Sequence, residues 1–254
     1  MGAMFLPARR RFPQGNGQGW SPLDLGPSLF AWWDAERADL ITQSGGAVSS
    51  WKDVVSGYEA VQAIGASKPS YGATSFGGRP GITGDGVDDE LTLAPVPAGI
   101  PTGSAPCELW AVVDQQALPA DTTGRQVLTY GQFSATNRLL VRNVSGGANR
   151  SALSVGNGST GVGTTNTSVD FSGRHIMRAV ISSSAIKLIV DGIGGAGAGV
   201  PVVPATTTER LRLFASASPA ATGFWQGALN TVLFTDLLSD GVVARLYANL
   251  LRRL

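Results

Sequence analysis

The end of the chain, from Phe224 to Leu254, constrains the fold most. Residues 225–235 are mostly β-branched, aromatic or small and include no proline, which predicts a strand buried on both faces. From Ser239 onward, apolar residues recur three and four positions apart, which predicts an amphipathic helix with Ser239 as N-cap and Asp240 in the first turn. Its apolar side would comprise Val242, Val243, Leu246, Tyr247, Leu250, Leu251 and Leu254, and its polar side Arg245, Asn249, Arg252 and Arg253.

Composition favours one all-β domain before that helix. The chain has 254 residues with 34 glycines and 14 prolines, which indicates many turns between short strands. Apolar residues make up 43%, enough for a full core. A net charge of +1 provides no sustained basic field to neutralise phosphates, so no nucleic-acid partner is expected. The single cysteine, Cys107, excludes an intrachain disulfide.

Residues 1–27 predict an extended arm, because they hold three arginines and four prolines with little periodicity. This arm is either a disordered tail or a peptide that orders when it docks on another protein. Its anchoring residues would be Phe5, Arg9, Arg10, Arg11, Phe12 and Trp20. The arginines follow a short apolar piece, the reverse of a secretory signal, and no run of about 18 apolar residues occurs, so neither export nor a membrane partner is expected.

The folded domain is predicted to begin at residue 28, with a first strand over residues 29–34. Trp32 and Trp33 are adjacent in this strand, so their side chains point to opposite faces. At least one of the two is therefore expected to anchor the core.

A series of short motifs follows that strand in a fixed order. The motifs are Trp51-Lys-Asp-Val-Val-Ser-Gly57, Ala66-Ser-Lys-Pro-Ser-Tyr71, Gly77-Gly-Arg-Pro-Gly-Ile82, Gly84-Asp-Gly-Val-Asp-Asp-Glu-Leu91, and a hairpin over residues 175–192 that ends in Asp191-Gly192. In this order they resemble the laminin-G-like, concanavalin A-like jelly-roll domains of phage and phage-like particle proteins. The resemblance covers about residues 28–254 and implies a sandwich of two antiparallel sheets with a short C-terminal helix.

No catalytic residues are predicted. Glucanases that share the jelly roll carry a Glu-x-Asp-x-x-Glu strand, and none of the five glutamates here lies in that pattern. The only histidine, His175, begins a strand and has no Gly-x-Ser-x-Gly elbow to serve, so a structural role is expected. Cys107 is expected to be a semi-buried residue without a nucleophilic role.

The densest carboxylate cluster is Asp85, Asp88 and Asp89. The resemblance implies that such a cluster at a sheet rim could bind calcium, a cation that prefers oxygen ligands. The same glycine and aspartate content also suits a tight turn that uses its own hydrogen bonds, and this interpretation is favoured. No other cofactor is expected.

A sugar-binding face is implied by the resemblance, on the concave sheet and the loops at one rim. Its candidate residues are Trp110, Tyr130, Phe133, Asn137 and Trp225. Strand alternation leaves each of these free to face either the ligand or the core.

The preferred function is a non-enzymatic virion component of a phage or gene-transfer-agent-like particle, assembled in the host cytoplasm. The arm would bind other virion proteins, and the jelly roll would decorate the particle or bind a host surface glycan. The alternatives are a glycan-active hydrolase of the same fold and an exported bacterial adhesin. A trimer is one expected assembly, because virion fibres are often trimeric, but the closing helix is expected to cover a sheet of its own domain.

Overall fold

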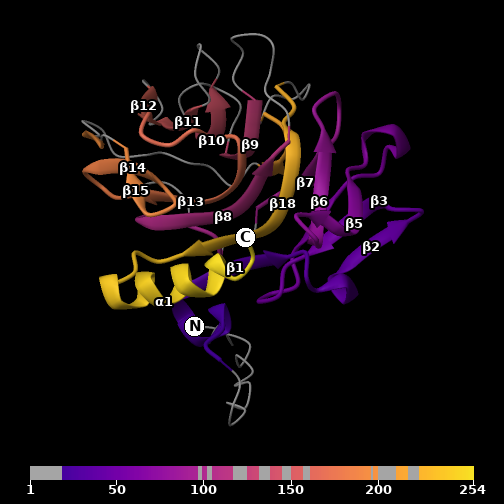
Figure 1. The fold of residues 1–254 in the computed structure, drawn as a ribbon, viewed down its shortest axis with the longest axis horizontal. Helices are drawn as coiled ribbons and strands as arrows, with labels where there is room; N and C mark the ends of the chain where they lie inside the picture. The colour runs from indigo at the N-terminus through magenta and orange to yellow at the C-terminus, as the bar shows by residue number, and fades with distance from the viewer. Residues whose placement is uncertain are drawn as a thin grey trace, which may run out of the picture.

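The computed structural model describes residues 19–96, 99–101, 105–116, 125–131, 138–144, 150–156, 161–195, 197–199, 210–216 and 223–254. These residues form an antiparallel β-sandwich with one α-helix at the C-terminal end (Figure 1). The predicted all-β fold is therefore confirmed. None of the described helices is both long enough and apolar enough to cross a membrane.

The first sheet is built around β18 (Gln226–Thr235), the strand predicted from the end of the sequence. One side of β18 pairs with β8 (Cys107–Gln115), and the other side pairs first with β6 (Arg79–Asp85) and then with β1 (Leu29–Asp34). Outward from these lie β5 (Ser70–Phe76), β13 (Gly173–Ile181), β14 (Ala185–Val190), β15 (Ile193–Gly194) and β16 (Ala198–Gly199). Nine of the ten residues of β18 are buried, so this strand is covered on both faces as predicted.

The second sheet packs against the first and contains nine strands among the described residues. In spatial order they are β12 (Gly161–Asn166), β11 (Arg150–Gly156), β10 (Arg138–Val144), β9 (Arg125–Gly131), β17 (Leu211–Leu213), β7 (Leu91–Leu93), β4 (Glu59–Val61), β3 (Ala47–Lys52) and β2 (Ile41–Ser44). One pairing, between Ala47 and Ser70, joins the two sheets at an edge.

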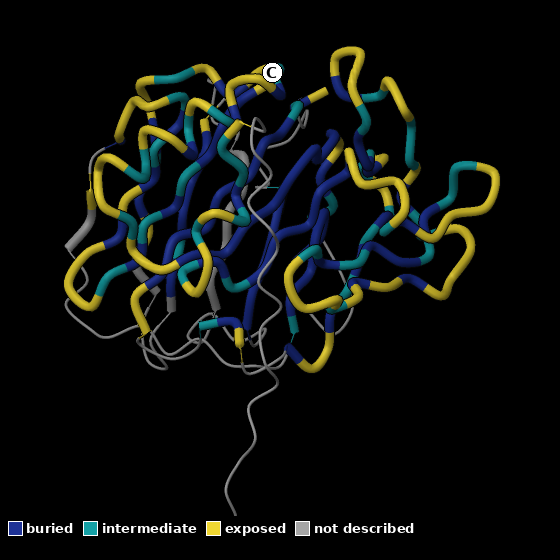
Figure 2. Tube along the Cα trace, turned by 90° about the horizontal axis from the view of Figure 1, so that it is seen from below, coloured by how far each residue is buried: buried dark blue, intermediate teal, exposed yellow. Residues whose placement is uncertain are grey.

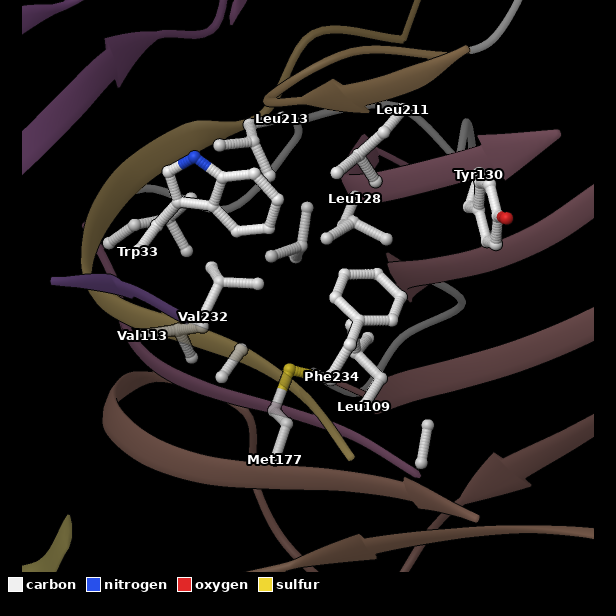
Figure 3. Packing of buried hydrophobic residues seen from close by; sticks show 14 of the residues in the cluster. Trp33, Leu109, Val113, Leu128, Tyr130, Met177, Leu211, Leu213, Val232 and Phe234 are labelled. Atoms are coloured by element: carbon white, nitrogen blue, oxygen red, sulfur yellow. The ribbon is translucent and has the colours of Figure 1, made fainter. Parts of the chain in front are cut away.

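The main core fills the space between the sheets (Figure 3). Phe234 of β18 lies near its centre, and its ring meets those of Trp33 and Tyr130 edge-on at centroid distances of 6.5 and 5.9 Å. Figure 2 shows that the strands are mostly buried and that the loops connecting them are mostly exposed.

A second core, here called the helix-side core, lies on the outer face of the first sheet. It joins Leu246 and Leu250 of α1 (Asp240–Leu251) to Trp32, Leu233 and neighbouring sheet residues. Trp33 belongs to the main core and Trp32 to the helix-side core, which confirms that the pair divides between two faces. Because both faces are covered, both tryptophans anchor a core.

The N-terminal boundary of the domain lies earlier than predicted. A 3₁₀ helix, η1 (Pro22–Ser28), begins with a capping box in which Ser21 and Asp24 bond each other's backbone. Asn249 of α1 donates a hydrogen bond to the Trp20 carbonyl at 2.9 Å, and Trp20 packs against the helix-side core. Trp20 and residues 22–28 are thus part of the fold and not of a free arm, whereas Phe5, Arg9, Arg10, Arg11 and Phe12 lie outside the described residues.

The closing helix is confirmed, with three corrections. Ser239 is the N-cap, but its backbone carbonyl, not its side chain, accepts bonds from Val242 and Val243. Leu251 is 47% exposed although it was placed on the apolar side. Arg253 was placed on the polar side, yet it is buried against Asp34, because the chain leaves the α-helix after residue 251.

The Trp51–Gly57 motif is structural. The buried Asp53 carboxylate accepts hydrogen bonds from the backbone amides of Trp32, Val55 and Ser56 at 2.6, 3.1 and 2.6 Å. It therefore closes its own turn and fastens that turn to β1. Gly57 completes the turn at φ 75°, a conformation that favours glycine.

Candidate functional site

Two of the predicted sugar-binding aromatic residues are core residues. Tyr130 is 1% exposed and packs on Phe234, and Trp225 is fully buried, stacked on Phe214 and bonded through its indole N–H to Gln115. Neither ring can stack on a sugar without leaving the core, so this prediction is wrong for both. Phe133 and Asn137 lie outside the described residues.

In its described part, the outer face of the second sheet carries polar side chains that bond to one another and to nearby backbone. Arg212 forms an ion pair with Glu90 at 3.0 Å and donates to the Ser216 carbonyl at 2.9 Å. Thr92 lies directly opposite Arg212 and accepts a bond from its Nε at 3.3 Å. These bonds stabilise this face of the sheet. Sugar binding at this face stays a prediction.

Trp110 has a different position, because it points out of the sandwich toward α1. Its ring is only 1% exposed, yet it contributes to the wall of a hollow of about 260 Å³ between the first sheet and the helix. We call this cavity the helix-side hollow. Its lining residues are Trp110, Ile176, Arg178, Ile189, Gly192, Asp240, Val243, Ala244 and Tyr247.

Strand register builds the floor of the helix-side hollow. Trp110 on β8 lies opposite Arg178 on β13, and Arg178 lies opposite Ile189 on β14. Directly opposed residues in antiparallel strands project from the same face, so the three side chains form one row beneath α1. The Arg178 guanidinium lies 5.1 Å from the centre of the Trp110 ring, a distance typical of a cation–π contact.

Glu108 lies two residues before Trp110 on the same face of β8 and holds this floor in place from the side. Its carboxylate, almost fully buried, accepts bonds from Arg178 Nη2 and Nε at 2.6 and 3.0 Å. It also accepts from Trp110 Nε1 at 3.0 Å and from the Leu238 amide at 3.1 Å. One carboxylate thus fixes the arginine, the indole and the segment that leads into α1.

The rim of the hollow is formed by α1 and by the turn after β14. Tyr247 and Asp240 come from the helix, and Gly192 comes from the turn. Burial, followed by the nearby Asp191 carboxylate, raises the pKa of Tyr247, so its hydroxyl stays protonated and can donate. The hollow therefore combines a floor of an indole ring, a guanidinium and an aliphatic side chain with a phenol and an exposed carboxylate at its rim.

Sequence reasoning found Trp110 and missed Arg178, Glu108, Asp240 and Tyr247 as neighbours. Tyr247 was assigned only to the apolar side of a helix, and Asp240 only to its first turn. Alternation along β13 would have placed Ile176 and Arg178 on one face, but the register with β8 was needed to bring Trp110 beside them.

The aspartate cluster lies in the turn after β6. Possible ligand atoms of Asp85, Asp88 and Asp89 lie within 4.8 Å of one another. Asp85 Oδ1 accepts bonds from the amides of Val87 and Asp88, and Asp89 Oδ2 accepts from the Asp85 amide at 2.9 Å. These bonds are those of a tight turn, and calcium binding stays a prediction. Burial, with Asp85 and Asp88 adding to it, raises the pKa of Asp89 to about 6.

Cys107 and His175 have structural environments. Burial raises the pKa of the Cys107 thiol to about 12, which suppresses the nucleophilic thiolate. His175 lies at 7% exposure, stacked on Phe171 and bonded to Asp191 and the Ser172 carbonyl.

No protein-family model matches the chain, and no protein of curated function matches it in sequence. Solved structures match its fold. A Trypanosoma rangeli sialidase in complex with 2,3-difluoro-KDN matches 96% of this chain and 35% of its own chain, at 15% identity and a TM-score of 0.62. Domain 4 of AbnA, a GH43 extracellular arabinanase from Geobacillus stearothermophilus, in complex with arabinotriose, matches 87% of this chain and 98% of its own, at 12% identity and a TM-score of 0.58.

A phage protein is among the structures of similar fold. The enzymatically active domain of tailspike protein 2 of bacteriophage CBA120 matches 72% of this chain and 29% of its own, at 17% identity and a TM-score of 0.53. The chain spans about a third of the length of the sialidases it matches. At sequence identities this low, the TM-scores show a shared fold and nothing more.

Proposed function

We propose that this chain is a non-enzymatic, laminin-G-like carbohydrate-binding domain that a phage or phage-like particle displays. The observation that carries the proposal is the helix-side hollow, which places the aromatic ring of Tyr247 beside polar groups of Asp240 and Arg178. Sugars are bound by this combination, because a ring packs on the apolar face of the sugar and charged side chains bond its hydroxyls. The volume of about 260 Å³ suits one sugar ring, since pockets for larger ligands begin near 300 Å³.

The carboxylates support binding over hydrolysis. Glycosidases need two carboxyl groups about 5–10 Å apart across the scissile bond. Among the residues that the structure describes, Asp240 is the one carboxylate that lines the hollow, and the nearby Glu108 has both oxygens occupied by four donors. A hydrogen-bonding role for Asp240 fits this arrangement better than acid–base catalysis.

Relatives in fold add two further supports. A domain of the same fold, matched over 98% of its length, is described in complex with arabinotriose. Another belongs to a phage tailspike protein. On this proposal, the residues before Gly19 attach the domain to other particle proteins.

A glycan array probed with the intact chain tests the binding proposal. The array should include arabinotriose, and each positive glycan is then measured by calorimetry. Tyr247→Ala should weaken binding about two- to tenfold, the value of one aromatic contact. Arg245→Ala, on the exposed side of α1, is the matched control and should leave the affinity unchanged. Equal affinity of the Tyr247 variant and wild type would refute the hollow as the site.

Two companion measurements test the rest of the proposal. Long incubation of the protein with bound glycans should release no new reducing ends, and their appearance would show an enzyme. Particles assembled with a chain that lacks residues 1–18 should lack the domain, and retained incorporation would contradict the anchoring role.

A further inference from the structure

The turn that forms one wall of the helix-side hollow is joined to β13 by the contact between His175 and Asp191 and by two hydrogen bonds to the Ile176 backbone. His175 Nδ1 lies 2.6 Å from Asp191 Oδ2, and His175 Nε2 lies 3.0 Å from the Ser172 carbonyl oxygen. Asp191 Oδ1 accepts a hydrogen bond from the Ile176 amide at 2.9 Å, and the Asp191 amide donates to the Ile176 carbonyl at 3.0 Å. The ion pair and these two backbone bonds tie the turn to β13.

Both nitrogens of the His175 ring therefore face acceptors. A carbonyl oxygen only accepts, and the Asp191 carboxylate already accepts from an amide through its other oxygen. A neutral imidazole has one N–H, so it would turn a lone pair toward one of these oxygens. The bonding pattern is satisfied only when His175 carries two protons and a positive charge.

The turn has a defined geometry. Asp191 and Gly192 connect β14 to β15 as a two-residue hairpin turn, and both have left-handed φ values of 50° and 79°. Asp and Gly are residues that this turn type favours, so the turn forms locally, and the bonds between Asp191 and β13 fix where it lies. Gly192 contributes to the wall of the hollow, and a Cβ placed there would lie 3.8 Å from the Tyr247 hydroxyl. The position of this turn therefore sets the wall opposite α1.

We propose that His175 and Asp191 form a pH-responsive latch, which fixes the Asp191–Gly192 wall of the helix-side hollow while His175 is protonated and releases it when His175 loses a proton. The latch stands on the geometry of the described residues, and its effect on ligand binding rests on the proposed function.

The surrounding charges favour the latched state. Burial by itself lowers the pKa of His175, but Asp191, the Ser172 carbonyl and Asp170 outweigh it, so the pKa lies above its ordinary value. Asp114 on β8 also interacts with His175, and Asp114 in turn interacts with the Arg174 guanidinium, which lies opposite it on β13. From α1, Tyr247 is protonated and adds no charge. A group whose pKa is raised by folding stabilises the fold below its ordinary pKa, and that stabilisation is lost as the pH rises through the folded value.

Nuclear magnetic resonance with hydrogen exchange tests the latch without any ligand. His175 is the only histidine, so its ring signals titrate without overlap. Its midpoint should lie above about 6.5. As the pH passes this midpoint, the protection of the Ile176, Asp191 and Gly195 amides, corrected for intrinsic exchange, should fall about tenfold for each pKa unit of elevation.

Asp191→Asn keeps a residue that tolerates the left-handed conformation and removes the charge. In this variant the His175 midpoint should fall to or below its ordinary value, and the pH step in protection should disappear. Asp170→Asn is the control, because Asp170 affects His175 through charge alone, and the step should persist. A midpoint at or below about 6.5 in the wild type, or protection that does not change through the titration, would overturn the latch. Because no glycan is present, failure of the latch and failure of glycan binding are separate results.

Discussion

Replacing Arg253 with methionine should lower the free energy of unfolding by about 3–5 kcal/mol. Arg253 Nη1 and Nη2 bond the two oxygens of Asp34 at 2.6 and 3.1 Å, and Nη1 also bonds Asn230 Oδ1 at 3.0 Å. Its guanidinium lies 5.8 Å from the Trp32 ring centre. Both partners are almost fully buried, so methionine would leave the Asp34 carboxylate buried without its hydrogen-bonded ion-pair partner.

Chemical denaturation in urea measures this loss, and thermal unfolding should show a fall in Tm of about 6–20 °C, taking about 2–4 °C for each kcal/mol. Arg252→Met is the matched control. Arg252 is the preceding residue and is exposed, so its change should stay within about 0.5 kcal/mol. Adding Asp34→Asn to Arg253→Met should recover part of the loss, because the unpaired charge is removed. A loss below about 1 kcal/mol for Arg253→Met, or one equal to the Arg252 control, would refute the reasoning.

Three further outcomes are expected from other buried groups. Glu108→Gln should lower the free energy of unfolding, measured in denaturant, by about 3–5 kcal/mol, because Arg178 loses its counter-charge. Glu36→Gln, in a partly exposed pair with Arg79, is the control and should cost less than about 1 kcal/mol. Similar losses for the two variants would contradict this prediction. Asp89 should titrate near pH 6 by carbon NMR. Because folding raises this pKa, the contribution of Asp89 to the free energy of unfolding should fall as the pH rises from about 4 to 6. A midpoint that calcium lowers would instead identify a metal site. Cys107, with a pKa of about 12, should react with a thiol reagent at pH 8 only after unfolding, and rapid reaction of the folded protein would show that its burial is not maintained.

Local patterns were enough to predict the elements that depend on neighbouring residues. The strand over residues 29–34, the long buried strand before residue 236 and the closing helix all follow from side-chain periodicity. The hairpin that ends in Asp191-Gly192 is likewise local, because its two-residue turn demands left-handed backbone at both positions. The aspartate-rich turn after β6 was favoured for the same reason, and its amide bonds agree with that interpretation.

The candidate site was predictable only in part. Trp110 was named from its residue type, together with Tyr130 and Trp225, and sequence could not separate the three. On most β-sandwiches one face of a strand is core and the other is solvent, but here the helix covers the outer face of β8 and β18. Burial on both faces removes the alternation that would have told a core tryptophan from one beside a cavity.

The sequence by itself determined the two-faced first strand, the long buried strand before residue 236 and the helix that ends the fold, because each depends on contacts between residues close in the chain. Tertiary structure alone decided that Trp110, Arg178 and Ile189 share one row, that Tyr247 lies over that row, and that Arg253 turns inward to Asp34. These contacts join residues far apart in the chain, and they depend on strand register and on which sheet face the helix covers. Neither quantity is encoded in a local pattern, because both are set by the packing of the whole domain.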